Sequence, residues 1–443
     1  MSNIALILNS DLPRTNVFAD YPHGDSVGIP MYALASTDLS AFCCIVITNY
    51  ADQRELLRCR EQLQCYLQQG GKLVFNGHVV HPFLDELRPY RPTHEPGLAG
   101  LQVHNLNAHP IFAGIESSEL TYRKGVAGFY GRGFNPPPAG AQVLNELGKQ
   151  ARLPLDWTYP YPGGGQLLVH AGNDFLSFSN APSAHGMRQA FYDWAAAAPV
   201  PGAGITDTQA PRHFAEPALR AESATSCPAR TDAPHAARVC FVEGGTYFHH
   251  RTLHTPEFAP YLQMRRHVLD LGPDDFAAAD TLVFCCETRG DLIARHRSAI
   301  TRFLDQGKTV VAMGNTNPQQ WLPQVSWTDC PTNFWWWITP GADSGLRLLW
   351  PEHSLFNYIT LADATWHQHG SFAIPEGARS LIDKEGHGSV LYEDRHSTPG
   401  RLIVTSLDPC YHHGSYFMPA TTRFLRGFLP WLHEHTAQAG STG

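Results

Sequence analysis

Features that would direct the chain to nucleic acid, to a membrane or to export are missing from the sequence. Lys and Arg total 32 residues against 40 Asp and Glu, a net charge of -8, so binding to nucleic acid or an anionic membrane is not expected. No apolar run approaches the roughly 20 residues of a membrane-spanning helix. The opening MSNIALILNSDLP has no basic residues before its apolar run and no small-residue cleavage site, so we expect a first strand and a cytoplasmic protein.

Without an export signal, the 10 cysteines are expected to be reduced thiols. Two adjacent pairs, Cys43–Cys44 and Cys285–Cys286, stand inside apolar runs. Buried cysteine behaves as a small apolar residue, so we expect both pairs in the core.

The chain repeats itself in sequence order. CYLQQGGKLVFNG (65–77) resembles TRFLDQGKTVVAMGN (301–315), HPIFAGI (109–115) resembles HSLFNYI (353–359), and GGGQLLVHAGNDF (163–175) resembles PGRLIVTSLDP (399–409). The segment 199–237 between the halves is rich in Ala, Pro, Thr and Ser, as linkers are. The sequence of 443 residues therefore predicts a first domain over 1–198, a linker over 199–237 and a second domain over 238–436.

Each half alternates apolar strands with amphipathic helices. The expected strands include 4–9, 42–49 and 72–77 in the first half, and 238–245, 281–287, 309–315 and 401–409 in the second. A helix is expected over 52–69, extra β-structure at WWWIT and TWHQHGSF, and a closing helix at the end. Strand–helix–strand units in series predict a mainly parallel sheet with helices on both faces.

The GGKLVFNGH strand and turn, the HPIFAGI segment and the closing GRLIVTSLDP strand carry a resemblance to a known family. The chain resembles the class I glutamine amidotransferase-like superfamily, and its ThuA-like branch in particular. The resemblance implies an α/β fold of two tandem flavodoxin-like domains and a ligand related to sugars.

The residues that define glutaminase activity in that superfamily are absent. A cysteine would stand at the turn after the third strand, with a His-x-Glu after a late strand. Here the turns carry His78 and Asn315, and neither VHAGND nor SLDPCYHHG contains His-x-Glu. Glutamine hydrolysis through a cysteine thioester is therefore not expected.

Candidate ligand-binding residues follow the strands, because ligands of open α/β sheets bind beyond the carboxyl ends of the strands. In the second half, Glu243, His249, Asp408 and His412 are the predicted catalytic residues. The predicted binding residues are Asn315, Glu287, His78 and Asn76.

The second half also gathers histidines. A mixed histidine and carboxylate rim suits a divalent metal such as zinc, manganese or iron, and His249, His250 and His413 are the predicted ligands. His367 and His369 are expected to face one side of a strand. The alternative is that these histidines form ordinary hydrogen bonds, as expected for His109 and His353, which should cap turns.

Two functions remain open at this point. One is a hydrolase-like enzyme that acts on a small polar molecule, such as a sugar derivative, at the second rim, with or without a metal. The other is a non-catalytic binding or assembly protein, with a homo-oligomer or a protein partner. The histidine-rich rim favours the first, and the missing cysteines favour the second.

Overall fold

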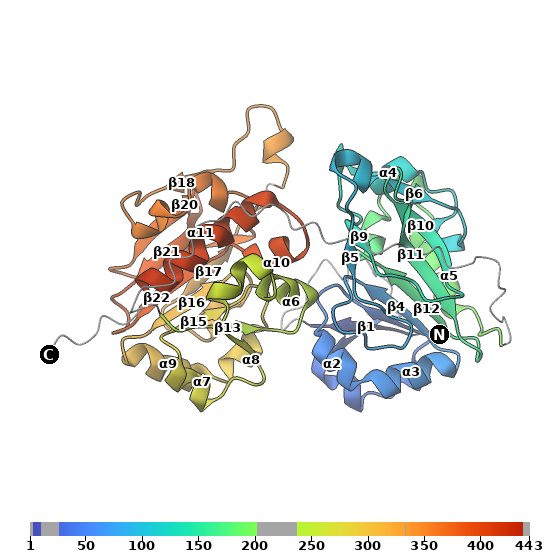
Figure 1. Cartoon of the computed structure of the whole chain (residues 1–443), viewed down its shortest axis with the longest axis horizontal. Coiled ribbons are helices and arrows are strands. Elements are labelled where there is room, and N and C mark those ends of the chain that lie inside the picture. Colours follow the sequence, from blue (N-terminus) through green and yellow to red (C-terminus); the bar gives the residue numbers. More distant parts are fainter. Residues whose placement is uncertain (1–2, 10–25, 202–236, 333, 437–443) are drawn as a thin grey trace. The chain divides into compact units, whose positions relative to one another are not determined.

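The computed structural model describes residues 3–9, 26–201, 237–332 and 334–436 (Figure 1). The chain divides into two compact units, Met1–Ala218 with Gly245–Tyr247, and Leu219–Gly244 with Phe248–Gly443. Nearly all of the predicted linker, 199–237, lies outside the described residues, so that assignment stays a prediction.

No helix in the described ranges has both the length and the apolar character needed to span a membrane.

The first unit is built on an eight-stranded sheet in the order β2-β1-β3-β4-β12-β11-β10-β6. Its first five strands are parallel and its last three antiparallel. The strands are β1 (Ile4–Leu8), β2 (Ser26–Pro30), β3 (Cys44–Ile47), β4 (Lys72–Asn76), β6 (Val103–Asn105), β10 (Gln142–Leu147), β11 (Leu153–Pro160) and β12 (Gln166–His170). The α-helices are α2 (Gln53–Arg58), α3 (Arg60–Gln68), α4 (Ser117–Thr121) and α5 (Met187–Ala196).

The second unit has a ten-stranded sheet whose path contains β14-β13-β15-β16-β22-β21, with β20 pairing β21 and β18 pairing β20. Its strands are β13 (Val239–Glu243), β14 (Met264–His267), β15 (Thr281–Phe284), β16 (Thr309–Met313), β17 (Ser326–Asp329), β18 (Leu346–Leu348), β19 (Gly370–Ala373), β20 (Arg379–Lys384), β21 (Gly388–Asp394) and β22 (Arg401–Thr405). Its α-helices are α6 (Tyr247–Leu253), α7 (Pro273–Ala278), α8 (Gly290–Ala294), α9 (Arg297–Asp305), α10 (Pro409–Gly414) and α11 (Pro419–His435).

The two sheets follow the same sequence of directions. In the second unit, as in the first, five parallel strands (β14-β13-β15-β16-β22) are followed by three antiparallel ones (β21-β20-β18). The mixed α/β class and the mainly parallel sheets predicted from the sequence are therefore confirmed.

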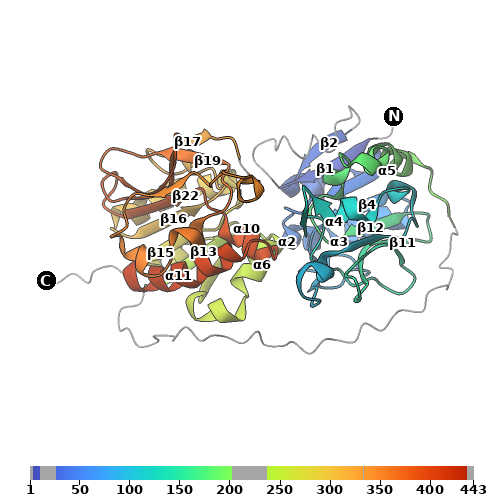
Figure 2. The same ribbon diagram turned by 90° about the horizontal axis from the view of Figure 1, so that it is seen from above.

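The buried strands explain the apolar runs of the sequence. One face of the second sheet, with Val239, Phe241 and Val283, shares a core with Phe424 and Phe428 of α11. Figure 2 shows α11 running along the strands of that unit. Because successive side chains point to opposite faces, the alternate residues are buried on the other face, and both faces of the sheet are apolar.

Three local expectations differ from the structure. The helix expected over 52–69 is interrupted at Cys59, which separates α2 from α3. The WWWIT segment is a 3₁₀ turn, Trp336–Ile338, with no buried residue, and not β-structure. In TWHQHGSF the strand begins only at Gly370.

The capping role expected for two histidines is confirmed. His109 Nδ1 accepts a hydrogen bond of 3.3 Å from the Ile111 N–H, and His353 Nδ1 accepts one of 3.3 Å from the Leu355 N–H. Each imidazole caps a 3₁₀ turn, Pro110–Phe112 or Ser354–Asn357. The similarity of HPIF and HSLF therefore reflects a shared turn.

Candidate functional site

The candidate residues of the second half follow strands that end at one edge of the sheet. Phe284 in β15 pairs with Val242 in β13 and with Ala312 in β16, and Met313 in β16 pairs with Thr405 in β22. The residues that follow these four parallel strands therefore share one edge, which we call the second-unit rim.

The first group on this rim is the pair Glu243 and His249. Glu243 Oε2 lies 3.9 Å from His249 Nδ1. That nitrogen accepts a hydrogen bond of 3.1 Å from the Gly244 N–H, while Nε2 faces the Cys286 carbonyl oxygen at 2.6 Å. His249 is fully buried, and a proton on Nε2 satisfies both contacts, so this imidazole is tied to the backbone and not available to a ligand.

The predicted metal ligands His249, His250 and His413 are not brought together as a cluster of ligand atoms. Both nitrogens of His413 meet hydroxyl groups, Nδ1 with Thr422 Oγ1 at 2.9 Å and Nε2 with Thr255 Oγ1 at 3.0 Å. Burial, assisted by Arg251 and Arg426, lowers the pKa of His413 to about 3.

His250 has a different neighbour, because its ring stacks on that of His254 with centroids 4.2 Å apart. Consecutive residues of a helix point to different sides, so His249 and His250 of α6 do not face one common ion.

A second group comprises His367, Asp408 and His412, and we call it the His–Asp–His triad. One ligand atom from each lies within 4.8 Å of the others, and this is the group of potential metal ligands that the described residues form. Asp408 is the N-cap residue of α10, and His412 follows it by one helical turn. His367 comes from the segment that leads into β19.

The triad is almost closed to solvent. The exposed fractions are 8% for His367, 5% for Asp408 and 3% for His412. His412 Nε2 lies 3.3 Å from Asp408 Oδ2, without the geometry of a hydrogen bond. The other Asp408 oxygen, Oδ1, accepts a hydrogen bond of 2.7 Å from Trp366 Nε1, which fixes the carboxylate.

The electrostatics of the triad favour a carboxylate beside a neutral imidazole. Burial acts to raise the pKa of Asp408, but the imidazoles of His412, His367 and His369 outweigh it and hold that pKa below its ordinary value. Burial lowers the pKa of His367 to about 3, helped by His412 and His369 and opposed by Asp408.

Aromatic rings lie against the triad. The Phe334 ring lies 4.2 Å from the His367 ring and 5.7 Å from the His369 ring. The ring centroids of His367 and His369 are 5.1 Å apart, so the two imidazoles are neighbours. Both residues precede strand β19 and are not part of it.

A third group joins Glu287 and Asn315. Asn315 Nδ2 donates a hydrogen bond of 2.9 Å to Glu287 Oε1. Glu287 has φ +67°, a left-handed conformation that non-glycine residues adopt at some cost and that is enriched at functional sites. A Cβ added to Gly314 would lie 3.2 Å from Asp408 Cβ and 2.7 Å from Cys286 Cβ, so this turn lies directly against the triad's carboxylate.

Cys410 is next to the triad in the sequence, and its thiol lies among other buried cysteines. It is buried, and hydrogen bonding with Cys285, burial and nearby negative groups raise its pKa, although a hydrogen bond from Cys286 acts in the opposite direction. Cys44, Cys285 and Cys286 are fully buried, which confirms the expected core role for these three, whereas Cys43 is half-buried.

In the first unit, the predicted binding residues serve the fold. Asn76 is fully buried. Its amide donates to the Ile47 carbonyl at 3.3 Å, and its side-chain oxygen accepts from the Phe175 N–H at 3.3 Å. His78 stacks on Tyr90 with centroids 3.6 Å apart. The first unit therefore lacks an equivalent of the triad at this turn, within the part of the chain that the structure describes.

A buried polar network lies deeper in the first unit. Asp156 accepts hydrogen bonds from Tyr130 at 2.9 Å and Asn145 at 2.6 Å, and its other oxygen meets His170 Nδ1 at 2.5 Å. All four side chains are almost or fully buried, so this network lies in the interior of the first unit.

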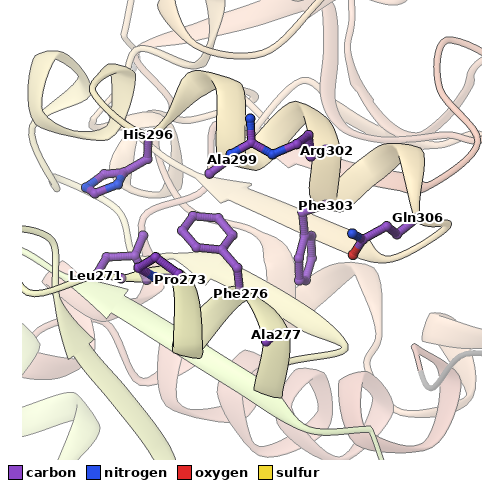
Figure 3. Close-up of a pocket in the computed structure, with 10 residues that line it drawn as sticks. Leu271, Pro273, Phe276, Ala277, His296, Ala299, Arg302, Phe303 and Gln306 are labelled. Atoms are coloured by element: carbon purple, nitrogen blue, oxygen red, sulfur yellow. The ribbon is translucent and has the colours of Figure 1, made fainter.

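A groove of about 340 Å³ lies elsewhere, between α7 and α9 of the second unit (Figure 3). Phe276 and Phe303 form its apolar part, and His296, Arg302 and Gln306 add polar groups. None of the triad or of the Glu287–Asn315 pair lines this groove, so it is separate from the rim.

Sequence reasoning found the rim but grouped its residues incorrectly. It chose Asp408 and His412, and it noted His367 without joining it to them. Trp366 and Phe334 were missed. The segment TWHQHG could have indicated Trp366, because this tryptophan, with its single N–H donor, directly precedes the potential metal ligand His367.

No family model matches the sequence, and no curated protein matches it either. Solved structures give weak likenesses. A structure described as the mmIFT52 N-terminal domain has a TM-score of 0.29 and 11% identity over 45% of this chain and 99% of that one.

Two β-galactosidases are also similar in part. The enzyme from Rahnella sp. R3 gives a TM-score of 0.25 and 17% identity over 43% of this chain and 31% of that one. Gan42B, a GH42 β-galactosidase, gives 0.24 and 13% over 44% and 29%. The chain spans less than a third of either enzyme, and likenesses this weak carry no argument about fold or function.

Proposed function

We propose that the second unit binds a small polar molecule at its rim and hydrolyses it. The observation that supports this most is a concentration of buried polar atoms without a hydrogen-bond partner. They follow β15, β16 and β22 or belong to the triad: Thr288 Oγ1, Thr316 Oγ1, Ser406 Oγ, His367 Nδ1 and both nitrogens of His412. Each such atom costs about 1–3 kcal/mol unless a ligand or ordered water meets it.

The groups at the rim suit hydrolysis. One side of the site, the His–Asp–His triad, can hold an attacking water, and Glu287 can exchange a proton with the leaving group. Asn315 holds the Glu287 carboxylate at 2.9 Å. The left-handed backbone conformation of Glu287 is of the kind found at functional sites and supports a role for its side chain in proton transfer.

The same proposal includes an origin by duplication. We take the two units as tandem flavodoxin-like domains of the class I glutamine amidotransferase-like kind, closest to the ThuA-like branch. Support comes from the matching strand orders, from the His109 and His353 caps and from the turns after β4 and β16. The Gly77 N–H donates to the His170 carbonyl at 3.0 Å, and the Gly314 N–H donates to the Thr405 carbonyl at 2.8 Å.

Glutaminase activity is not part of the proposal. Gly77 and Gly314 keep the turn but are followed by His78 and Asn315 and not by cysteine. We expect no ammonia release from glutamine above a buffer blank, measured with a coupled glutamate assay. Release that follows enzyme concentration and is abolished in a Cys410→Ser variant would contradict this.

The test of the hydrolytic proposal is a screen of small polar esters, amides and glycosides. A substrate should raise the melting temperature of the protein and be converted to products, detected by mass spectrometry. Glu287→Gln should lower kcat at least tenfold with little change in the melting temperature. Glu257→Gln is the matched control, because this exposed residue pairs with Arg426 away from the rim and should leave kcat unchanged.

The alternative, a non-catalytic binding protein, makes a different prediction for the same experiment. A ligand would stabilise the protein, its stabilisation would be lost in Glu287→Gln, and no product would form. The unequal turns of the two units favour this alternative. If no compound stabilises the protein and none is converted, both readings of the rim fail.

A further inference from the structure

The His–Asp–His triad on the second-unit rim has the composition of a metal-binding site. We infer that the His–Asp–His triad binds one zinc-class divalent transition-metal ion through His367, Asp408 and His412. This deepens the proposed function, because it rests on the same rim, but it can be tested without any substrate.

The distances are close to those of a metal site. Zinc bonds of about 2.0–2.1 Å in a tetrahedral arrangement place ligand atoms about 3.3 Å apart. The Nε2 atom of His412 and the Oδ2 atom of Asp408 already lie 3.3 Å apart. The third ligand atom, from His367, lies within 4.8 Å of both.

The triad also lacks the partners that a structural role would supply. His367 Nδ1 and His412 Nδ1 are buried without a hydrogen bond, and the partner of His412 Nε2 is the Asp408 carboxylate of the triad itself, 3.3 Å away. A histidine kept for packing normally has at least one nitrogen bonded, as His249 and His413 do. An ion would accept the lone pairs that no described donor meets.

A hydrogen bond from a neighbouring side chain holds one of the three ligands in place, as is common in metal sites. Trp366 Nε1 donates to Asp408 Oδ1 at 2.7 Å. That bond leaves Oδ2, the oxygen nearer His412, to face the ion. Ligating carboxylates are commonly held in this way, because a fixed ligand pays less entropy when the ion binds.

The donor set selects the class of ion. Two imidazoles and one carboxylate suit zinc, and also iron(II) or manganese(II), whereas calcium and magnesium prefer oxygen ligands alone. Three protein ligands leave a position for water or for a ligand oxygen. A metal kept only for folding usually has four protein ligands, so an open position points to a working site.

The experiment uses the full chain, stripped with a chelator and then titrated with zinc in a calorimeter. One ion per chain should bind, and cobalt(II) in its place should give the visible absorption bands of a tetrahedral site. Asp408→Asn and His367→Gln should each weaken zinc binding at least tenfold and remove the cobalt bands. His250→Gln, on α6 and outside the triad, is the control and should bind as the unaltered protein does.

Folding is checked by circular dichroism, and His367→Gln, at the more exposed end of the triad, keeps the test usable if Asp408→Asn does not fold. Absence of stoichiometric zinc and cobalt binding would overturn the inference, and so would binding that survives in both variants. A protein that binds no metal but still converts a substrate would refute the ion and leave the proposed function standing. If the protein binds stoichiometric metal but no compound of the screen binds or is converted, the metal site stands and the proposed function fails.

Discussion

At the scale of single residues, the most informative contact is the hydrogen bond from Trp366 to Asp408. Trp366→Phe removes the N–H that holds Asp408 Oδ1 at 2.7 Å but keeps a buried ring. Loss of such a supporting bond typically weakens metal affinity by about 10–100-fold. We expect this loss in calorimetric zinc titrations, together with a lower melting temperature, because the buried Asp408 Oδ1 loses its donor.

Trp337→Phe is the matched control for this change, because Trp337 is 51% exposed on its 3₁₀ turn. It should bind zinc normally. Equal affinity in Trp366→Phe and in the unaltered protein would show that Asp408 is positioned by other contacts.

A second prediction concerns Asn135, which holds the first turn in place. Its amide donates to the Gly77 carbonyl at 2.9 Å, and its oxygen accepts from the Val79 N–H at 2.9 Å. Asn135 is fully buried, so Asn135→Ala leaves the Gly77 carbonyl and the Val79 N–H without their hydrogen-bond partner. This change should lower the free energy of unfolding by about 2–4 kcal/mol. Urea denaturation measures this, with Asn180→Ala, at an exposed turn position, as the control.

Residue types revealed part of the candidate site before the structure did. Asp408 and His412 could be chosen because they follow a predicted strand and the carboxyl ends of parallel strands meet at one edge. His249 was chosen for the same reason, yet its two nitrogens bind the backbone of neighbouring strand ends. Such partners are non-local backbone atoms, and a sequence pattern does not locate them.

At the scale of elements, strand β21 carries a buried ionic group. Glu393 accepts hydrogen bonds of 2.6 Å from Arg395 Nε and 2.6 Å from Arg401 Nε, and it lies 3.3 Å from His353 Nε2. Burial acts to raise the pKa of Glu393, but these partners outweigh it and lower that pKa to about 2.

The direction of the pH dependence follows from that shift. Because the folded pKa lies below the unfolded value, the carboxylate stabilises the fold above about pH 4.5, and the contribution is lost as the pH falls from there through about 2. We expect the loss to reach about 2–3 kcal/mol, measured as the urea unfolding free energy between pH 7 and pH 3.

The variant Glu393→Gln should show a smaller pH dependence in this range and a lower stability at pH 7. Asp383→Asn, on the neighbouring strand β20 and outside this group, is the control. A variant whose stability falls with acid as steeply as the unaltered protein would show that Glu393 is not the group that titrates.

Elements with a clear apolar pattern were predictable, and those with ambiguous patterns were not. The strands expected over 238–245, 309–315 and 401–409 contain β13, β16 and β22, because apolar residues run through each of them almost without interruption. WWWIT is also rich in aromatic and β-branched residues, but it is a surface turn with Trp337 exposed. Three large apolar residues in a row fit a strand and a turn equally well, and only their tertiary surroundings decide.

At the scale of the whole molecule, the alternation of apolar strands with amphipathic helices predicted the mixed α/β class and the mainly parallel sheets. The antiparallel strands β10, β11, β20 and β21 were not expected from the sequence. They pair as hairpins of neighbouring segments, β10 with β11 and β20 with β21, but polar residues interrupt them, so none stands out as an apolar run. The assignment of the linker stays a prediction, since most of 199–237 lies outside the described residues.

The two units also have separate cores, and this allows a final test of the site. One apolar cluster lies within residues 237–432, and two lie within residues 4–195. We expect calorimetry of the full chain to show two unfolding transitions, as multidomain chains often do. Asn135→Ala should lower the transition of the first unit and so identify it.

Zinc should then raise only the other transition, because the triad lies in the second unit. At a free concentration one hundred times its Kd, an ion that binds only the folded state stabilises it by about 2.7 kcal/mol, and a chelator should reverse the shift. A zinc-dependent shift of the transition that Asn135→Ala marks would place the ion in the first unit and contradict the assignment of His367, Asp408 and His412. A single transition, moved by zinc and by Asn135→Ala alike, would show that the two cores unfold together.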